Sequence, residues 1–352
     1  MQKICSDTCS VIILNYNGWK DTLACLNKVD ALVTRPRRTI VVDNCSTDDS
    51  IENIMEYWQA PRQAPVIHES EIQYLTAIPE SDNILLVCSR NRGYAAGNNL
   101  GIILAKLDPQ CPAVWILNND TEPDPMSLEH LCATMNSHPA AGISGSTQVF
   151  ARSGVVQSAG GGSVSRWLGT THSLKEFFPL HEVLQCDEAT INAQIDFTAG
   201  ASMLVRRETI EQVGLLPEEY FLYYEDVDYG VRVKKTGFDL VWARNSIVYH
   251  HDGSSTRKQE GTAPAWVDFL ILRNRLYFIK KYFIFAVPSA IFGYAGVAFN
   301  RIRRGQVERL KNIFPAIFDA LNGKMGKSDR AMRIASADVH AHLIAVRLST
   351  QF

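Results

Sequence analysis

The sequence predicts an α/β fold in which a mostly parallel central sheet is flanked by helices, followed by a helical C-terminal extension. Three observations support this. The first 120 residues alternate between short β-branched runs and segments with helical spacing, as βα units do. The runs end in polar residues, and after about residue 256 long apolar helical segments take over. We therefore predict an α/β domain over 1–256 and a helical region over 257–352.

The α/β part is predicted to alternate strands with helices. SVIILNYN (10–17) is a β-branched run typical of a buried parallel strand. Apolar residues then recur at helical spacing over 18–29, which places Trp19, Leu23, Leu26 and Val29 on one face. Further strands are predicted at 39–43, 83–89 and 113–120 and within 196–214 and 239–251; helices are predicted within 91–107, 127–139 and 196–214 and after 221, whereas 60–83 and the stretch from 140 are predicted to be irregular.

Polar side chains end four of the predicted strands. In an open parallel sheet, ligands bind beyond the carboxyl ends of the strands, and these ends meet at one edge. Four polar ends at that edge predict a ligand site. The residues are Asn15, Asn17, Asp43, Asn44, Asn91, Asn118, Asn119 and Asp120.

Composition limits the class of protein. A hydrophobic content of 46% with 20% charged residues indicates a folded chain with a sizeable core, and a net charge of −2 argues against nucleic acid as a partner. The eight scattered cysteines form no disulfide framework or zinc spacing, so we expect reduced thiols in the cytosol. The polar start MQKICSDTCS is unlike a signal peptide, so we expect no export by that route.

Three loops carry side chains suited to a nucleotide. In VVDNCSTDD (41–49) an Asp at a strand end could accept hydrogen bonds from a pyrimidine imide and a ribose, although Ser46 and its neighbours also fit a simple helix cap. NRGYAAGNN (91–99) offers glycines for close backbone approach and Arg92 for a phosphate or sugar. In WILNNDTEPDP (115–125), Asp120 could bind a divalent cation that a diphosphate helps to coordinate. The G-x-G-x-x-G and G-K-[ST] patterns are absent, which argues against dehydrogenases and P-loop enzymes.

The segment 221–239 places three acids directly behind a run of aromatic residues. One interpretation is the charged first turn of a helix. The other is a half-buried carboxylate whose pKa is raised toward that of a proton acceptor. Asp228 and Arg232 are four residues apart, which predicts a salt bridge along a helix.

The C-terminal region contains an uncharged stretch, 282–300, with basic residues on both sides. A spanning helix needs about 20 apolar residues, so this stretch is borderline. Pro288, Gly293 and Gly296 fit an interfacial or packed segment better, with a true span and an ordinary core helix as alternatives. We expect peripheral membrane contact through 257–305.

In order along the chain, these motifs resemble the inverting nucleotide-sugar glycosyltransferases of family 2, which have the GT-A fold. The resemblance spans roughly 10–256 and is specific as an ordered set rather than motif by motif. Within the family it is most similar to bacterial rhamnosyltransferases and galactofuranosyltransferases that build surface polysaccharides. The Q-x-x-R-W pattern of processive members is absent, which favours one sugar per acceptor. The motifs are VIILNYNG, VVDNCSTDDS, NRGYAAGNN, LNNDTEPD, TAGASMLVRRETIEQVG, YYEDVDYGVRVKKTG and YHHDGSST.

The resemblance implies roles for individual residues. Asp226 would be the catalytic base, supported by Glu225, and Asp43 would contact the donor base. Asp120 matches the metal-binding end of the family's Asp-x-Asp motif, in which Asn118 here replaces the first Asp. His250, favoured over His251, would join Asp120 in binding Mg²⁺ or Mn²⁺. The donor-binding residues implied are Asn15, Asn17, Asp43, Asn44, Ser46, Asn91, Arg92, Gly93, Asn98, Asn118, Asn119, Gly200 and Ala201.

The resemblance also implies a reaction. A hexosyl group, rhamnose first and galactofuranose second, would pass with inversion from a dTDP- or UDP-sugar to a hydroxyl of a lipid-linked or growing surface glycan. The enzyme would be cytoplasmic, at the inner face of the cytoplasmic membrane. Two alternatives stay open: a nucleotide-sugar-binding protein that has lost catalysis, and a nucleotidyltransferase, for which NYNGWKD lacks a basic phosphate-binding loop.

Overall fold

The chain forms two compact units, each described by itself. The computed structural model describes residues 3–59, 64–251, 264–327 and 333–334. The first unit, here called the sheet unit, comprises 1–164, 171–218 and 225–255; the second, the helical unit, comprises 165–170, 219–224 and 256–352. Parts of the predicted motif YHHDGSST and of the predicted region 257–352 lie outside the described residues.

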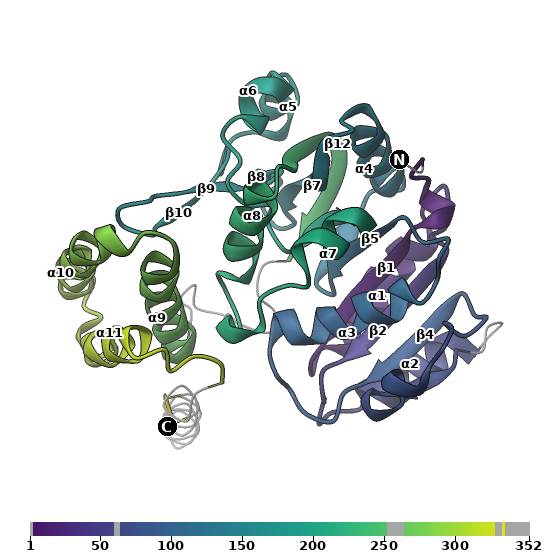
Figure 1. The fold of residues 1–352 in the computed structure, drawn as a ribbon, viewed down its shortest axis with the longest axis horizontal. Coiled ribbons are helices and arrows are strands. Elements are labelled where there is room, and N and C mark those ends of the chain that lie inside the picture. The colour runs from purple at the N-terminus through teal and green to yellow at the C-terminus, as the bar shows by residue number, and fades with distance from the viewer. Residues whose placement is uncertain (1–2, 60–63, 252–263, 328–332, 335–352) are drawn as a thin grey trace, which may run out of the picture. The chain divides into compact units, whose positions relative to one another are not determined.

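A mixed, mostly parallel sheet forms the centre of the sheet unit (Figure 1). Its strands follow the order β3-β4-β2-β1-β5-β11-β7-β12-β6, and β8 pairs with β7 outside this path. The first five strands of this order run parallel, β11 is antiparallel to both neighbours, and β7 and β12 are again parallel. The predicted fold class is therefore confirmed. The strands are β1 (Ser10–Asn15), β2 (Arg38–Asp43), β3 (Val66–His68), β4 (Asn83–Val87), β5 (Ala113–Asn118), β6 (Thr121–Pro123), β7 (Ala141–Phe150), β8 (Val156–Ala159), β11 (Ser202–Arg206) and β12 (Asp239–His250).

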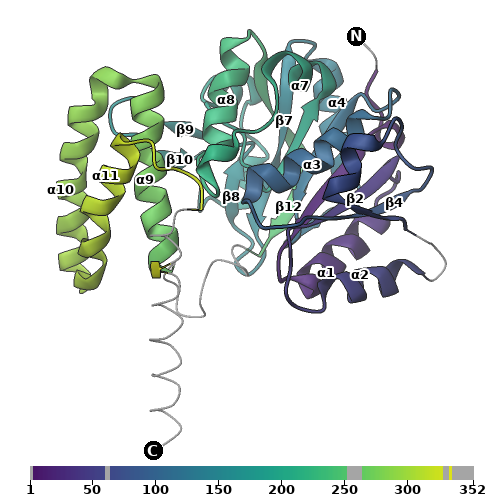
Figure 2. The ribbon, with the colours of Figure 1, turned by 60° about the horizontal axis from the view of Figure 1, so that its bottom comes forward.

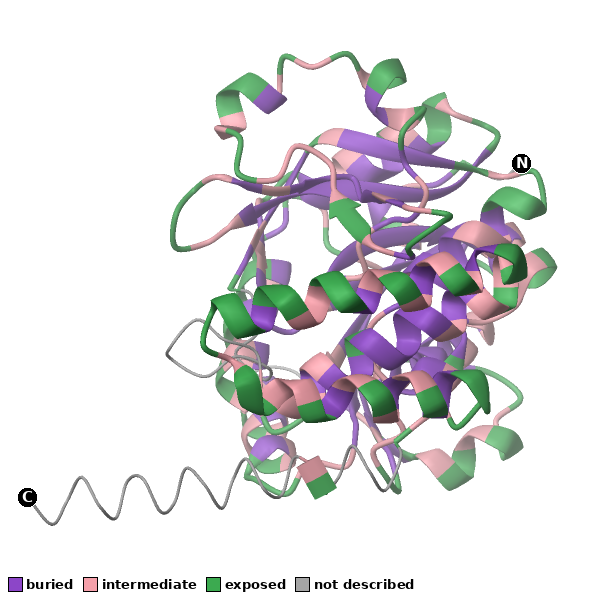
Figure 3. Ribbon diagram, turned by 90° about the vertical axis from the view of Figure 1, so that its left-hand side faces the viewer, coloured by how far each residue is buried: buried purple, intermediate pink, exposed green. Residues whose placement is uncertain are grey.

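Helices cover both faces of this sheet (Figure 2). One apolar cluster joins the sheet to α3 (Tyr94–Lys106), α7 (Arg207–Val213) and α8 (Glu225–Lys235). A second cluster joins the other face to α1 (Trp19–Asp30), α2 (Ser50–Gln59) and α4 (Ser127–Ser137). Figure 3 shows most strand residues buried, whereas the helices combine buried, half-buried and exposed residues. Smaller elements are β9 (Gly162–Val164), β10 (Thr171–Ser173), α5 (Leu180–Val183), α6 (Glu188–Asn192) and the 3₁₀ turns η1 (Ser6–Thr8), η2 (Glu69–Tyr74) and η3 (Glu218–Tyr220).

The segment 141–150, predicted to be irregular, is instead the long strand β7, buried along nearly its whole length. Its small residues misled the prediction because they are needed for close packing. A Cβ atom on Gly145 would lie 2.2 Å from the carbonyl oxygen of Gly160. The three-residue strands β3 and β6 were also not predicted. The buried face of α1 is Thr22, Cys25, Leu26 and Val29, whereas Trp19 and Leu23 are only half-buried.

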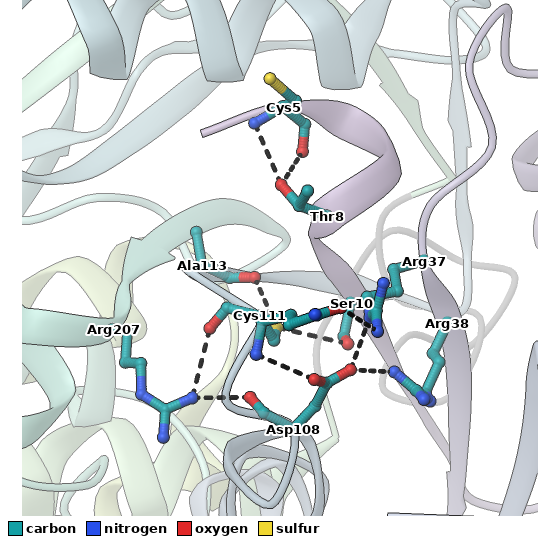
Figure 4. Close-up of polar contacts among 10 residues, drawn as sticks. Cys5, Thr8, Ser10, Arg37, Arg38, Asp108, Cys111, Ala113 and Arg207 are labelled. Carbon is teal, nitrogen blue, oxygen red and sulfur yellow. Dashed lines mark hydrogen bonds and ion pairs between the residues drawn. The ribbon is translucent and has the colours of Figure 1, made fainter. Parts of the chain in front are cut away.

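An ion-pair cluster fastens the amino-terminal edge of the sheet (Figure 4). The carboxylate of Asp108 accepts from Arg37 Nε at 2.5 Å and pairs with Arg38, the first residue of β2. Burial opposes ionisation of Asp108, but the arginine hydrogen bonds and charges outweigh it and lower its pKa. Arg207 donates to the Asp108 carbonyl at 2.7 Å and so ties in the start of α7. These side chains are stably paired at the edge opposite the polar strand ends.

The helical unit contains α9 (Ala265–Tyr282), α10 (Val287–Arg303) and α11 (Ile313–Leu321), with the 3₁₀ turns η4 (Ile284–Ala286) and η5 (Val307–Asn312). Two buried polar residues of α9 hold the segment 219–224: Arg273 donates to the Tyr220 carbonyl, and Asn274 donates to the Leu222 and Tyr223 carbonyls. In this segment Phe221, Tyr223 and Tyr224 have positive φ angles of 70°, 68° and 75°. Within the described ranges, no helix is both long and apolar enough to cross a membrane.

Candidate active site

The carboxyl ends of β1 and β2 are joined by a network of short polar side chains. Asn15 donates from Nδ2 to Asp43 Oδ2 at 2.8 Å and to Ser46 Oγ at 3.1 Å. Asp43 Oδ1 accepts the backbone N–H of Ser46 at 2.9 Å, and Ser46 Oγ accepts the N–H of Asn17. Asp43 is fully buried. Ser46 therefore connects two strand ends, and Asp48 Oδ1 accepts the backbone N–H of Ser50, the first residue of α2, at 3.2 Å.

The loop before α3 joins the same edge. Asn44 donates from Nδ2 to Asn91 Oδ1 at 3.2 Å and to the Gly93 carbonyl at 3.1 Å. Gly93 has φ of 102°, a conformation that favours glycine. Arg92, expected to contact a phosphate or sugar, forms an ion pair with Glu69. Asn98 lies fully buried within α3, where its Nδ2 donates to the Tyr94 carbonyl.

A short turn at 199–201 links three parts of the site. The Ala201 carbonyl accepts the backbone N–H of Asn118, at the end of β5, at 3.0 Å. The Gly200 carbonyl accepts the hydroxyl of Tyr94, at the start of α3, at 2.7 Å. The Gly200 N–H in turn faces Asp226 Oδ2 at 3.4 Å, at the start of α8. Tyr94 and Gly200, which are 106 positions apart in the chain, thus meet at one turn.

The backbone hydrogen bond from Asn118 to Ala201 holds the end of β5 against the turn 199–201. Asn119, the next residue, is buried and donates to Thr22 Oγ1 at 3.1 Å. Thr22 donates to Asn15 Oδ1 at 2.8 Å, which connects β5 to the network at the ends of β1 and β2. Side chains thus join the carboxyl ends of β1, β2 and β5 at one edge of the sheet.

The two acids at the start of α8 differ in burial and in pKa. Burial, followed by the neighbouring charge of Asp226, raises the pKa of Glu225 to about 8. Burial raises the pKa of half-buried Asp226 to about 6, although hydrogen bonds from the Val227 and Gly200 N–H groups oppose the rise. At pH 7 Glu225 therefore keeps its proton while Asp226 is mostly ionised. An ionised carboxylate with a pKa near working pH is suited to accept a proton.

Asp120 and His250 form the second reactive pair. The Nε2 atom of His250 lies 3.2 Å from Asp120 Oδ1, and its Nδ1 atom lies 2.9 Å from Gln157 Oε1. If Nδ1–H donates to Gln157, a neutral imidazole directs the lone pair of Nε2 toward the carboxylate. Two cis ligands of an octahedral cation, each about 2.1 Å from it, would lie about 3.0 Å apart. The pair therefore fits two positions on a divalent cation.

Two protein ligands are fewer than a closed metal site requires. Over the described parts of the chain, no group of three or more His, Cys, Asp or Glu side chains is arranged to hold a metal ion. A cation bound with a diphosphate needs only one or two protein carboxylates, because phosphate and water oxygens complete the shell. Asp120 and His250 fit that open kind of site.

Other predicted side chains have different surroundings. His251 is exposed and pairs through Nε2 with Glu122 Oε1 at 2.8 Å, while its backbone N–H donates to the Asp120 carbonyl at 2.9 Å. The salt bridge predicted between Asp228 and Arg232 stays a prediction; the guanidinium of Arg232 donates to the carbonyls of Val213, the last residue of α7, and of Leu215. Its role is to connect α8 to the preceding loop.

The sequence reasoning missed two residues that the structure places in the site. Burial and the nearby carboxylates of Glu225, Asp226 and Asp120 raise the pKa of Tyr94. Gln157, on β8, fixes the imidazole of His250. Tyr94 could have been found from its place directly after Gly93 in the Gly-rich loop. Gln157 gave no signal, because the irregular appearance of 140–160 hid the strand that carries it.

The chain thus folds as an α/β sheet with acidic and imidazole side chains at its carboxyl edge. Two family models match the chain: "Glycosyl transferase family 2" over residues 10–157 and "Glycosyl transferase family group 2" over residues 113–303. The chain belongs to the family 2 glycosyltransferases, and it is a glycosyltransferase.

Named relatives agree with this assignment. The chain is 22% identical over 299 residues to the low-salt glycan biosynthesis hexosyltransferase Agl10 of Haloferax volcanii, covering 83% of this chain and 93% of the relative. It is 26% identical over 262 residues to the N-acetylglucosaminyl-diphospho-decaprenol L-rhamnosyltransferase of Mycobacterium tuberculosis, covering 71% and 78%.

Solved structures share the fold. The mannosyltransferase PcManGT of Pyrobaculum calidifontis, in complex with GDP-Man and Mn²⁺, matches with a TM-score of 0.53 and 13% identity over 89% of this chain and 87% of that one. GalNAc-T7 with UDP, GalNAc and Mn²⁺ matches with a TM-score of 0.54 and 15% identity over 78% of this chain. The match covers 47% of the GalNAc-T7 chain, so this chain spans about half of that structure.

Proposed function

We propose that this glycosyltransferase moves a hexosyl group, with inversion, from a nucleotide-diphosphate sugar to a hydroxyl group of a glycan. The observation that carries the proposal is the shared edge: half-buried Asp226 and the pair Asp120–His250 lie at the carboxyl ends of one sheet, and the turn 199–201 connects the start of α8 to the end of β5. Such a site can hold a leaving diphosphate on one side and an acceptor on the other.

Asp226 is proposed as the base. The acceptor hydroxyl must lose a proton as its oxygen attacks the anomeric carbon, and Asp226 Oδ1 or Oδ2 can take that proton. One base and one direct displacement invert the anomeric configuration. Glu225, protonated at neutral pH, adds no second negative charge beside the base, so Asp226 keeps an accessible pKa. The polar network around Asn15, Asp43 and Ser46 is proposed to border the donor nucleoside.

Asp120 and His250 are proposed to hold Mg²⁺ or Mn²⁺. When bound, such a cation would offset the charge that develops on the leaving diphosphate. Gln157 would fix the tautomer and orientation of His250. The Mn²⁺ in the related PcManGT and GalNAc-T7 structures supports the choice of metal. Arg92, which pairs with Glu69 in this structure, is proposed as a further contact to the donor.

The donor and acceptor are proposed from the relatives. A relative acting on a diphospho-decaprenol acceptor supports a dTDP-rhamnose donor and a lipid-linked or growing glycan, with UDP-galactofuranose as the second choice of donor. This acceptor would place the enzyme in the cytoplasm at the inner face of the membrane, with peripheral contact through 257–305. We also propose residue 256 as the boundary between the catalytic α/β domain and the helical C-terminal region.

A donor panel tests the proposed function. Purified protein with Mg²⁺ or Mn²⁺ is incubated with dTDP- and UDP-sugars, and release of the nucleotide diphosphate is measured with and without a prenyl-diphosphate-linked acceptor. We expect acceptor-dependent release from one donor. Donor binding without turnover would instead support a nucleotide-sugar-binding protein, and no binding of any donor would reject the proposal.

A further inference from the structure

The helical unit contains a cavity of about 430 Å³ that the proposed reaction does not use. It lies between α9, α10 and η5, and its volume is in the range of small-ligand sites. Its lining combines arginines with apolar side chains. The lining residues are Asp268, Ile271, Leu272, Arg275, Val297, Asn300, Arg301, Arg304, Gln306 and Arg309.

The charge of this cavity is strongly positive, because four arginines face a single carboxylate. Asp268 is itself engaged: its Oδ1 accepts from Arg301 at 2.6 Å. Arg301 is buried and also donates to the Arg309 carbonyl at 2.7 Å, so its guanidinium is fixed in place. Guanidinium groups gathered at one cavity are typical of phosphate-binding sites.

One further arginine is held rigidly at the cavity wall. Arg275 donates from Nε to the Leu168 carbonyl at 2.5 Å, and its guanidinium lies 5.2 Å from the ring centroid of Tyr294. Arg304, at the end of α10, is exposed. The cavity therefore pairs buried, preoriented arginines with an exposed one that a ligand could meet first.

Apolar side chains accompany these charges. Ile271 and Val297 line the cavity, and Ile271 is 36% exposed. The remaining surface of α10 exposes Phe292, Phe299 and Ile302, at 80%, 66% and 57%. A free inorganic anion would make no favourable contact with apolar side chains, whereas a phospholipid or prenyl phosphate carries a phosphate and a hydrocarbon chain together. Large exposed apolar side chains beside cationic ones are typical of lipid surfaces.

We propose that this cavity binds the phosphate or diphosphate group of a membrane lipid, with the hydrocarbon chain on Ile271 and Val297. The binding itself stands on the cavity alone. Identifying the bound lipid as the glycan carrier, a prenyl diphosphate, rests on the proposed function.

The test compares Arg303, the last residue of α10, with Arg304, the residue that follows it. Arg304 lines the cavity, whereas Arg303 is exposed and does not line it. Binding of farnesyl diphosphate, dihexanoyl phosphatidic acid and inorganic diphosphate to the full chain is measured by calorimetry, with Arg304→Gln and Arg303→Gln as matched variants. Thermal unfolding checks that both variants fold.

We expect at least one of the two lipids to bind, and Arg304→Gln to weaken that binding about tenfold, because a charge-assisted hydrogen bond is lost. Arg303→Gln should change it less than about twofold. Inorganic diphosphate should bind at least about tenfold more weakly than the lipid. Equal losses in the two variants would show general charge attraction, and equal affinity for inorganic diphosphate would show a free-anion site; either result overturns the proposal.

Binding of the nucleotide donor separates this inference from the proposed function. If the donor binds and turns over but neither lipid binds, the cavity inference alone fails. If a lipid binds as expected while no donor binds, the cavity inference stands, and the proposed function and the identification of the lipid as glycan carrier both fail.

Discussion

His250 Nε2 lies 3.2 Å from Asp120 Oδ1, and the opposite ring nitrogen of His250 faces Gln157. The backbone supports this arrangement, because β12 carries His250 directly beside Thr121 of β6, the residue after Asp120. A pair positioned by strand register is preorganised, and it needs a third ligand from the substrate.

Replacing His250 should weaken Mn²⁺ binding more than replacing His251, the next residue in the chain. We expect His250→Gln to raise the Mn²⁺ dissociation constant, measured by electron paramagnetic resonance with the nucleotide diphosphate present, by at least about tenfold. Gln157→Leu should cost about tenfold to a hundredfold, since it frees the imidazole. His251→Gln is the control, because His251 pairs with Glu122. Similar losses at positions 250 and 251 would contradict the assignment.

The rate of transfer should depend on the ionisation of Asp226. Because the base acts in its ionised form, kcat/KM should rise with pH through an apparent pKa of about 6 and then level off. An exposed aspartate would place this rise near pH 4. A pH–rate profile from pH 4.5 to 8 distinguishes the two, and a rate that is flat across this range would argue against a buried base.

Glu225→Gln should change how stability depends on pH. The pKa of the Glu225 carboxyl is about 8 in the folded protein and 4.5 in the unfolded chain. Proton binding by Glu225 therefore stabilises the fold fully below pH 4.5, and this stabilisation is lost as the pH rises toward 8. Glutamine does not titrate. The free energy of unfolding of Glu225→Gln, relative to the wild type, should therefore rise by about 1 kcal/mol per pH unit between pH 5 and 7.

Urea unfolding at pH 5, 6 and 7 measures this difference. Glu52→Gln, on the exposed face of α2, serves as the control and should follow the wild type. A Glu225→Gln difference that stays constant with pH would mean that Glu225 is ionised in the folded protein at neutral pH.

Two glycine substitutions should have opposite effects on stability. In Gly145→Ala the new Cβ would lie 2.2 Å from the Gly160 carbonyl oxygen, so we expect a loss of about 3 kcal/mol. In Gly296→Ala, within α10, the Cβ would meet nothing within 4 Å, and helix propensity should add about 0.5–1 kcal/mol. Thermal unfolding measures both, and a neutral Gly145→Ala would show that β7 is not closely packed there.

The strands of the parallel half of the sheet could be predicted because each has a recognisable local sequence pattern. Runs such as 39–43 and 83–89 are β-branched, buried on both faces and followed by polar residues, so strand position and ligand edge could both be predicted. Strand β7 was not predicted because its glycine and serine residues are required by close packing against other segments, such as that of Gly145 against Gly160. Packing of that kind has no local pattern.

The sequence allowed the positions of the acidic residues to be predicted better than the contacts that other side chains make. Asp120, Asp226 and His250 lie on one edge, as expected, because each ends a strand or begins a helix there. The pairing of Arg92 with Glu69 depends on two segments of irregular sequence meeting, and the role of Gln157 depends on the unpredicted strand β8. Such contacts follow from tertiary structure and are not encoded in the spacing of residues.

The most direct measurement compares Asp226→Asn with Asp228→Asn in a transfer assay that also reports the anomeric configuration of the product by NMR. We expect the wild type to invert that configuration. We expect Asp226→Asn to bind donor normally while its rate falls by about 10²–10⁴, and Asp228→Asn to lose less activity at equal folding. Retained configuration in the wild-type product, or full activity of Asp226→Asn, would contradict a single-base transfer at Asp226.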